Sequence, residues 1–146
     1  MTPTSTDSEV RWHRISPTPS YSIELPDDCA EDIDGSVLSY WRADDSTALQ
    51  ISSYRRTSGE QATARERLAA RMARGGQPVL SPIDLPLPYT NHAAAIGTDD
   101  EKVTWLYVYI TWQKLTLLAT LSGRRVDLLN ERSWSRRALA SIRPAL

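Results

Sequence analysis

The chain has 146 residues, of which 40% are hydrophobic, with a formal net charge of -1 and a single cysteine. This length suits one domain with a real hydrophobic core, and the near-neutral charge argues against wholesale attraction to nucleic acid or to an anionic membrane surface. A lone Cys29 excludes a disulfide within the chain, and no apolar run approaches the ~20 residues that span a bilayer. The N-terminus has no apolar signal segment, so we expect a cytosolic protein without membrane insertion.

Residues 1–20 are rich in Thr, Ser and Pro, and we expect them to form a mobile tail in which only Trp12 and Ile15 are able to dock. A single domain then spans residues 21–146. Its first predicted strand is YSIEL at 21–25, where apolar and polar residues alternate. The acidic segment DDCAEDIDG at 27–35 follows, and we interpret it as a solvated connector.

The acidic segment has enough carboxylates to suggest a calcium loop, but their spacing does not fit one. With Gly35 as the central glycine, Ala30 falls at the first ligand position and no closing glutamate follows. His13 and His92 have no partners at a metal-ligand spacing. Cys29 stands among acids that disfavour its thiolate. We therefore predict no metal, no cofactor and no catalytic residue.

Segments 36–42 (SVLSYWR) and 47–54 (TALQISSY) flank a short polar loop and predict a β-hairpin. If Arg42 faces Thr47, every second side chain shares a face. The face predicted to be core carries Leu38, Tyr40, Leu49 and Ile51. The opposite face carries Val37, Trp41, Ala48 and Gln50.

A first helix is predicted after residue 57, where Thr57 with Glu60, or Ser58 with Gln61, has the spacing of a capping box. The glycines at 75–76 are expected to end it. Its apolar stripe contains Ala64, Leu68 and Met72. Its basic face contains Arg67, Arg71 and Arg74.

Four prolines between residues 77 and 91 forbid a helix there and predict an irregular connection, with room for an edge strand. HAAAIG, KVTWLYVYITW and LTLLATLSG then form a predicted three-strand meander. We pair Trp112 with Leu115 in its second hairpin and, across TDDE, Ala94 with Trp105 and His92 with Tyr107. A last helix is expected from about residue 127 to residue 142.

The predicted strand at 104–112 is apolar on both faces. One face is aliphatic, whereas the other carries Trp105, Tyr107 and Tyr109. Such a strand needs a cover on each face, and two amphipathic helices are available. We therefore expect an α+β fold: a three-layer α/β/α sandwich with a central antiparallel sheet and one helix against each face.

The aromatic face has two interpretations. In one, it is a second core beneath a helix; in the other, the helix covers it only partly and leaves a groove for an apolar or aromatic segment of a partner. The arginines of the first helix would border this groove. The candidate partner-binding residues are Trp105, Tyr107, Tyr109, His92, Arg67, Arg71 and Arg74.

The order YSIELPDD, two short hairpin strands, an Arg-rich helix, a meander and a C-terminal helix ending in IRP resembles the PsbP-like superfamily over residues 20–144. That superfamily includes the extrinsic photosystem protein, a nuclear-import factor that binds the Ran GTPase, and small bacterial proteins of unknown function or with chaperone-like roles. The resemblance implies an α/β/α sandwich and no catalytic residues. The family often has a tryptophan shortly after the proline, where this chain has Cys29.

We predict a non-enzymatic protein-binding module: a cytosolic adaptor or chaperone-like accessory protein, with a secreted effector as one candidate associate. Acids concentrate before residue 46 and arginines on the helices, so we expect another protein with an acidic or apolar segment as partner. The scarcity of lysine argues against nucleic acid. Two alternatives stay open: a small hydrolase whose site is assembled from non-adjacent residues, and an immunity protein.

Overall fold

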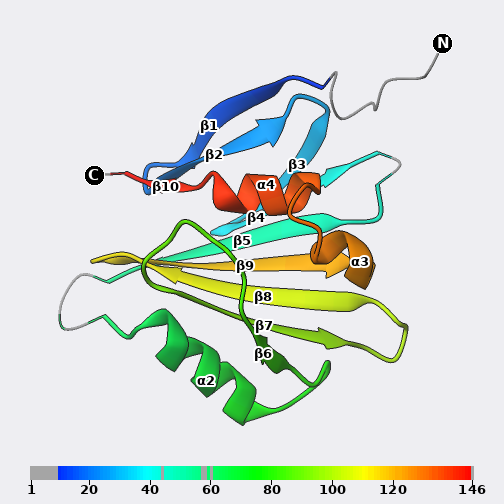
Figure 1. Ribbon diagram of the computed structural model, residues 1–146. Helices are drawn as coiled ribbons and strands as arrows, with labels where there is room; N and C mark the ends of the chain where they lie inside the picture. Colours follow the sequence, from blue (N-terminus) through cyan, green and yellow to red (C-terminus); the bar gives the residue numbers. More distant parts are fainter. Residues whose placement is uncertain (1–9, 44, 57–58, 60, 146) are drawn as a thin grey trace.

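The structure, a computed structural model, describes residues 10–43, 45–56, 59 and 61–145. Strands account for 47% of these residues and helices for 17%. The strands form two antiparallel sheets, a small one in the order β1-β2-β10 and a large one in the order β3-β4-β5-β9-β8-β7-β6. Figure 1 shows the small sheet and α4 at the β3–β5 end of the large sheet and α2 at the β6–β7 end.

The small sheet contains β1 (Trp12–Thr18), β2 (Tyr21–Pro26) and β10 (Arg143–Pro144). The large sheet contains β3 (Cys29–Asp34), β4 (Val37–Arg42), β5 (Ala48–Arg55), β6 (Ser81–Ile83), β7 (His92–Thr98), β8 (Thr104–Thr111) and β9 (Leu115–Gly123). The helices are α2 (Ala64–Arg74), α3 (Arg125–Leu128) and α4 (Trp134–Ala140).

The predicted three-layer α/β/α sandwich is wrong, because helices do not form a full layer. The antiparallel central sheet is confirmed, but its inner face, which carries Leu49, Leu106 and Leu121, packs against three different elements. These elements are the small sheet through Tyr21 and Ile23, α4, and the irregular segment 84–91. The fold is mostly β.

The expected long C-terminal helix is interrupted by a turn at residues 129–133. The Asn130 carbonyl oxygen accepts hydrogen bonds from both the backbone N–H and the hydroxyl of Ser133, at 3.0 and 2.8 Å. This leaves α4 with only seven residues, about 10 Å of helix. Such a short helix cannot cover the sheet, so β2 packs over the rest of the inner face through its buried alternate residues.

The registers of two hairpins are confirmed. Trp41 pairs with Ala48, which continues the predicted Arg42–Thr47 alignment, and the core side chains of this hairpin are at most 2% exposed. In the β8–β9 hairpin Leu106 pairs with Leu121, as predicted, and the Trp112 N–H donates to the Leu115 carbonyl oxygen at 2.8 Å. Both loops are short, so the loop length and the apolar alternation together determine the pairing.

The predicted β7–β8 register is wrong by three residues. His92 pairs with Ile110 instead of Tyr107. The cause is the turn at 99–103, in which Asp99 Oδ1 accepts from the backbone N–H groups of Glu101 and Val103 at 2.9 and 3.0 Å. An odd shift moves each β7 side chain to the opposite face. His92 therefore lies on the inner face, away from the aromatic side chains.

Helix α2 begins later than predicted. Thr63 is its N-cap: the Thr63 hydroxyl accepts from the Glu66 N–H at 3.1 Å, and the Glu66 carboxylate accepts from the Thr63 N–H at 2.9 Å. The predicted cap positions Thr57, Ser58 and Glu60 lie outside the described residues. The end of the helix at Gly75 agrees with the prediction.

Two segments interpreted as irregular are strands. The predicted mobile tail contains β1, in which Ile15 pairs with Ile23 and Trp12 with Pro26. The Arg137 guanidinium carbon lies 3.9 Å from the centroid of the Trp12 ring, a cation–π contact that ties β1 to α4. The predicted acidic connector contains β3, which pairs with β4 along its whole length and carries its exposed acids at the edge of the large sheet.

Deleting residues 2–17 removes most of β1, its pairing with β2 and the Trp12–Arg137 contact. We expect the melting temperature, followed by circular dichroism, to fall by more than about 5 °C, which corresponds to roughly 1 kcal/mol or more in a domain of this size. Trp41→Ala, at an exposed tryptophan, is the control. A deletion variant that melts within about 2 °C of the wild type would contradict this role for β1.

Candidate functional site

The outer face of the large sheet, opposite the inner face, is organised in rows, because directly paired residues point to the same side. One row begins with a tryptophan on β4 and reaches a second one on β8; it contains Trp41, Ala48, Ser122, Trp105 and Gly97. The next row contains Ser39, Gln50, Thr120, Tyr107 and Ala95. Small and polar side chains therefore lie between the aromatic ones.

Helix α2 packs on the β7–β8 part of this face. Its Leu68 side chain lies in a second core with Ala95, Tyr109 and Leu118. Farther along the rows, Gln50 is exposed and Trp41 is 42% exposed. We name the accessible part the open strip; it consists of Ser39, Trp41, Ala48, Gln50, Thr120 and Ser122. Trp105 and Tyr107, both half-buried, form its border on the α2 side.

The border aromatics are held by Arg71 of α2. Its Nε donates to the Tyr109 hydroxyl at 2.9 Å, and its guanidinium carbon lies 5.0 Å from the centroid of the Tyr107 ring. This geometry joins a hydrogen bond to a cation–π contact. The guanidinium therefore fixes the half-buried Tyr107 beside the open strip.

Trp105 is fixed from the other end of β8. Its indole Nε1 donates to Asp99 Oδ2 at 2.9 Å. The pKa of Asp99 lies below its ordinary value of 3.8. The bond from Trp105 contributes most to this decrease, and the bond from the Val103 N–H contributes next. One carboxylate thus sets both the β7–β8 turn and the orientation of the Trp105 ring.

The structure brings together four of the seven predicted site residues: Trp105, Tyr107, Tyr109 and Arg71. Tyr109 is only 6% exposed and belongs to the core, which agrees, for this residue, with the interpretation of the aromatic face as a second core. Trp105 and Tyr107 lie at the margin of the cover, where the helix leaves them half-buried. The two interpretations of the aromatic face thus apply to different residues of one strand.

The other three predicted residues lie elsewhere. Arg67 donates to the Gln61 side chain at 3.0 Å, and Arg74 is exposed at the end of α2. The ring nitrogens of His92 lie 2.7 and 3.1 Å from the carbonyl oxygens of Tyr89 and Leu85, so that this side chain fastens the segment 84–91 to β7.

Trp41 and Gln50 were not among the predicted candidate residues. The signal was available, because the hairpin register places both on the face opposite the core. What the sequence does not show is that α2 stops short of them.

Two cavities flank α2. One of about 190 Å³ lies at its C-terminal end and is lined by Arg71, Met72, Tyr107 and residues 75–80. The other, of about 360 Å³, lies between α2 and β6 and is lined mainly by Leu68, Met72, Ile83, His92, Ala93 and Ala94. The first joins the Tyr107 border to an exposed Val79.

Groups suited to metal or thiolate chemistry are not gathered in the described part of the chain. No set of three or more His, Cys, Asp or Glu side chains in it is placed to hold a metal ion. Burial, and after it the charge of Asp28, raises the pKa of Cys29 to about 11. Among the described helices, none has the length and apolar character needed to cross a bilayer.

Comparison with known proteins places only the fold. No family model matches the sequence, and no curated protein matches it. A protein from Bacteroides thetaiotaomicron, known from a crystal structure at 1.50 Å resolution, is similar, with a TM-score of 0.57 and 14% sequence identity. The match covers 85% of this chain and 44% of the Bacteroides protein, so this chain spans less than half the length of that protein. The PsbP-like resemblance stays a prediction.

Asp99 gives the site a defined pH dependence. Its folded-state pKa is depressed, so its contribution to stability is present above the ordinary value of 3.8 and is lost as the pH falls through the folded-state pKa. We expect Asp99→Asn to lower the urea midpoint most near neutral pH, and the gap to the wild type to narrow as the pH falls below 3.8. A gap that stays constant down to acid pH would contradict this assignment.

Cys29 should be a slow nucleophile. A pKa raised from 9.0 to about 11 leaves roughly a hundredfold less thiolate near neutral pH. We expect alkylation by iodoacetamide at pH 8 to be slower in the folded protein than in urea by a comparable factor. Equal rates in the two states would show that the folded environment does not protect the thiol.

Proposed function

We propose that this protein is a non-enzymatic protein-binding module, a cytosolic adaptor or chaperone-like accessory protein, that accepts an amphipathic helix of its partner on the open strip. The observation that carries the proposal is the half-covered outer face. α2 occupies one part of it, and the rest extends from the exposed Trp41 across small side chains to the half-buried Trp105.

The dimensions of the open strip suit a helix. Trp41 on β4 and Trp105 on β8 are separated by three strand spacings, about 14 Å. A helix with its side chains is about 10–12 Å across, so it fits along the strands between the two rings. Ala48 and Ser122, which lie in the row between the tryptophans, allow close approach of its backbone.

The energetics also favour a protein partner. Tryptophan, tyrosine and arginine are the residue types that most often dominate binding energy at interfaces, and the border of the open strip offers Trp105, Tyr107 and Arg71 together. Arg74, three residues after Arg71 on α2, is exposed. A partner helix with an apolar face and acidic residues on the flank facing α2 would complement this surface.

The test places a photo-crosslinking amino acid at Gln50, in the open strip, and at Val126, which is 68% exposed on α3, as the matched control. We expect Gln50 alone to crosslink a specific protein in cell extract, through a peptide that is helical in its own fold. Crosslinks of equal yield from both positions, or to a non-helical segment, would contradict the proposed docking mode.

Trp41→Ala should then weaken binding of the purified partner without unfolding the domain. We expect at least a tenfold rise in Kd, about 1.4 kcal/mol, because an exposed aromatic anchor beside the bound helix is lost. Val126→Ala is the control and should leave Kd unchanged. Titration calorimetry measures both variants, and urea melts verify that their stabilities match. A Trp41→Ala variant with unchanged Kd would place the interface elsewhere.

A further inference from the structure

The inner side of the molecule contains a buried arginine that is only partly satisfied. Arg136, on α4, is 3% exposed. Its Nη1 donates to the Leu128 carbonyl oxygen at 3.0 Å, whereas its Nε has no hydrogen-bond partner among the described residues. A buried guanidinium without a hydrogen-bonded carboxylate is costly, because the charge has lost its water.

The local charges agree with this picture. Burial lowers the pKa of Arg136, and the nearby negative charge of Glu131 acts in the opposite direction. Glu131 itself is exposed, and no ion pair joins the two side chains within the described residues. Nε is enclosed by protein atoms, whereas Nη2 is not among the enclosed atoms and has no hydrogen bond within the described residues, so Nη2 is the donor that Arg136 keeps for an acceptor from outside.

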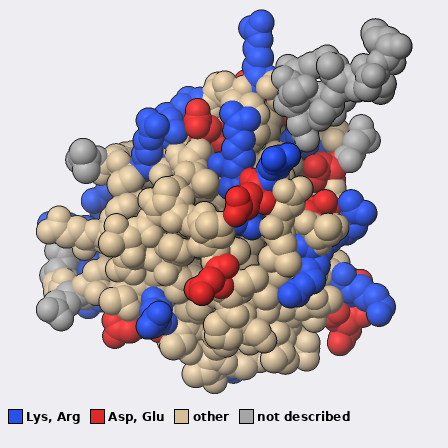
Figure 2. Space-filling view, in the orientation of Figure 1, with Lys and Arg blue, Asp and Glu red and all other residues tan. Residues whose placement is uncertain are grey.

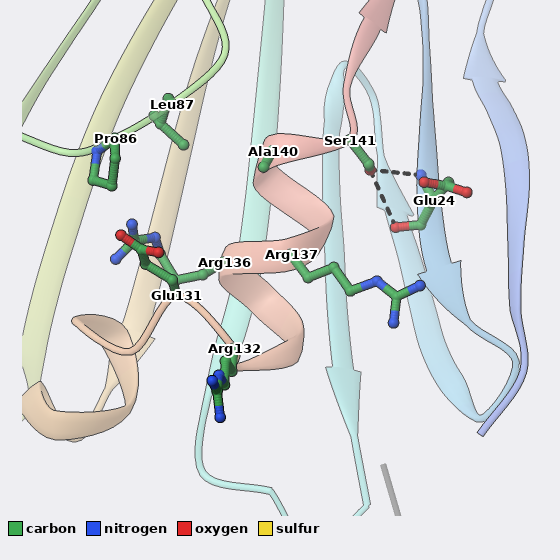
Figure 3. A pocket seen from close by; sticks show the side chains of 9 residues that line it. All are labelled: Glu24, Pro86, Leu87, Glu131, Arg132, Arg136, Arg137, Ala140 and Ser141. Atoms are coloured by element: carbon green, nitrogen blue, oxygen red, sulfur yellow. Dashed lines mark hydrogen bonds between the residues drawn. The ribbon is translucent and has the colours of Figure 1, made fainter. Parts of the chain in front are cut away.

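Arg136 lines a cavity of about 570 Å³. Its walls are formed by Glu24, Pro86, Leu87, Glu131, Arg132, Arg136, Arg137, Ala140 and Ser141. Figure 3 shows the Arg136 guanidinium beside Glu131, on the side of α4 that faces Pro86 and Leu87, while Arg137 points the other way. The volume lies within the range of sites for small molecules, about 300–1,000 Å³.

The charged groups around the cavity favour a ligand with one negative charge. Three arginines and two glutamates line it, so their formal sum is +1. Glu24 forms an ion pair with Arg14, with 3.5 Å between a guanidinium nitrogen and a carboxylate oxygen. Figure 2 shows positive and negative side chains gathered over α4, next to a large area without charge.

Apart from Ser141, the remaining wall is apolar. Pro86, Leu87 and Ala140 face the cavity with no donor or acceptor on their side chains. A second cavity of about 360 Å³ shares Glu24, Ala140 and Ser141 with the first; Pro88, Tyr89 and Ile142 also line it, together with Arg14 and Arg143. An acid with an apolar body could therefore place its carboxylate near Arg136 and its body against the apolar side chains.

We propose that this cavity binds a small monocarboxylate with an apolar body, whose carboxylate accepts hydrogen bonds from Arg136 and whose body lies against Pro86, Leu87 and Ala140. Arginine suits this role because its planar guanidinium matches the carboxylate fork. The site lies on the inner side of the large sheet and is independent of the open strip.

The test uses hexanoate as probe, with hexan-1-ol and hexylphosphate as its neutral and dianionic counterparts. Binding is followed by amide chemical shifts in ¹H–¹⁵N spectra and by titration calorimetry. We expect saturable binding of hexanoate with shift changes at residues 86–87 and 131–141, and binding at least tenfold weaker for each counterpart. Tightest binding by hexylphosphate would identify a phosphate site and overturn the carboxylate assignment.

Arg136→Met is the central variant, because an apolar side chain of similar length is expected to be tolerated in a buried position. It should abolish hexanoate binding, whereas Arg125→Gln, at an exposed arginine of α3, should retain it. Ala140→Leu fills the cavity without touching the charge and should also block binding, which keeps the test decisive if Arg136→Met does not fold. Unchanged hexanoate affinity in Ala140→Leu, or no saturable binding to the wild type, would refute the proposal.

Discussion

The fold depends on the need to cover strand β8 on both faces. On its inner side Leu106, Val108 and Ile110 are completely buried, and on its outer side Tyr109 is nearly so. The two covers differ in kind. The small sheet, α4 and the segment 84–91 share the inner face, whereas α2 lies on the outer face near β7. Because one helix is narrower than the seven-stranded sheet, the outer cover ends beside Trp105 and Tyr107, and the open strip is the part that it leaves accessible.

Local pairing could be predicted from the sequence wherever apolar alternation met a short polar loop. The β4–β5 and β8–β9 registers are of this kind, since a shift by one residue would expose Leu49 or Leu121, and the short loop excludes larger shifts. The β7–β8 register was not predictable in this way, because the carboxylate of Asp99 closes a longer turn by accepting two backbone N–H groups. That single side chain decides on which face His92 lies.

The layers were harder to predict than the pairings. The segment Cys29–Asp34 is acidic and Trp12–Thr18 is poor in apolar residues, yet both are strands because a neighbouring strand supplies their hydrogen bonds. Edge strands with charged side chains resist further pairing, which accounts for acids on β3. For the candidate site, the aromatic border was readable from alternation in β8. The importance of Trp41 was not, because it depends on how far α2 extends.

Stability alone does not account for Arg136. An apolar side chain would fill the same space against α3 without a desolvation cost, and buried charges can often be replaced in this way without loss of stability. Here the guanidinium has one carbonyl partner and borders a cavity whose far wall, Pro86 and Leu87, belongs to an irregular segment. That segment is fastened to β7 through His92. A regular helix in place of the segment 84–91 would satisfy its own backbone hydrogen bonds and fit more tightly against α4. The irregular segment therefore leaves room for the cavity and leaves Arg136 Nε without a partner in the described part of the chain.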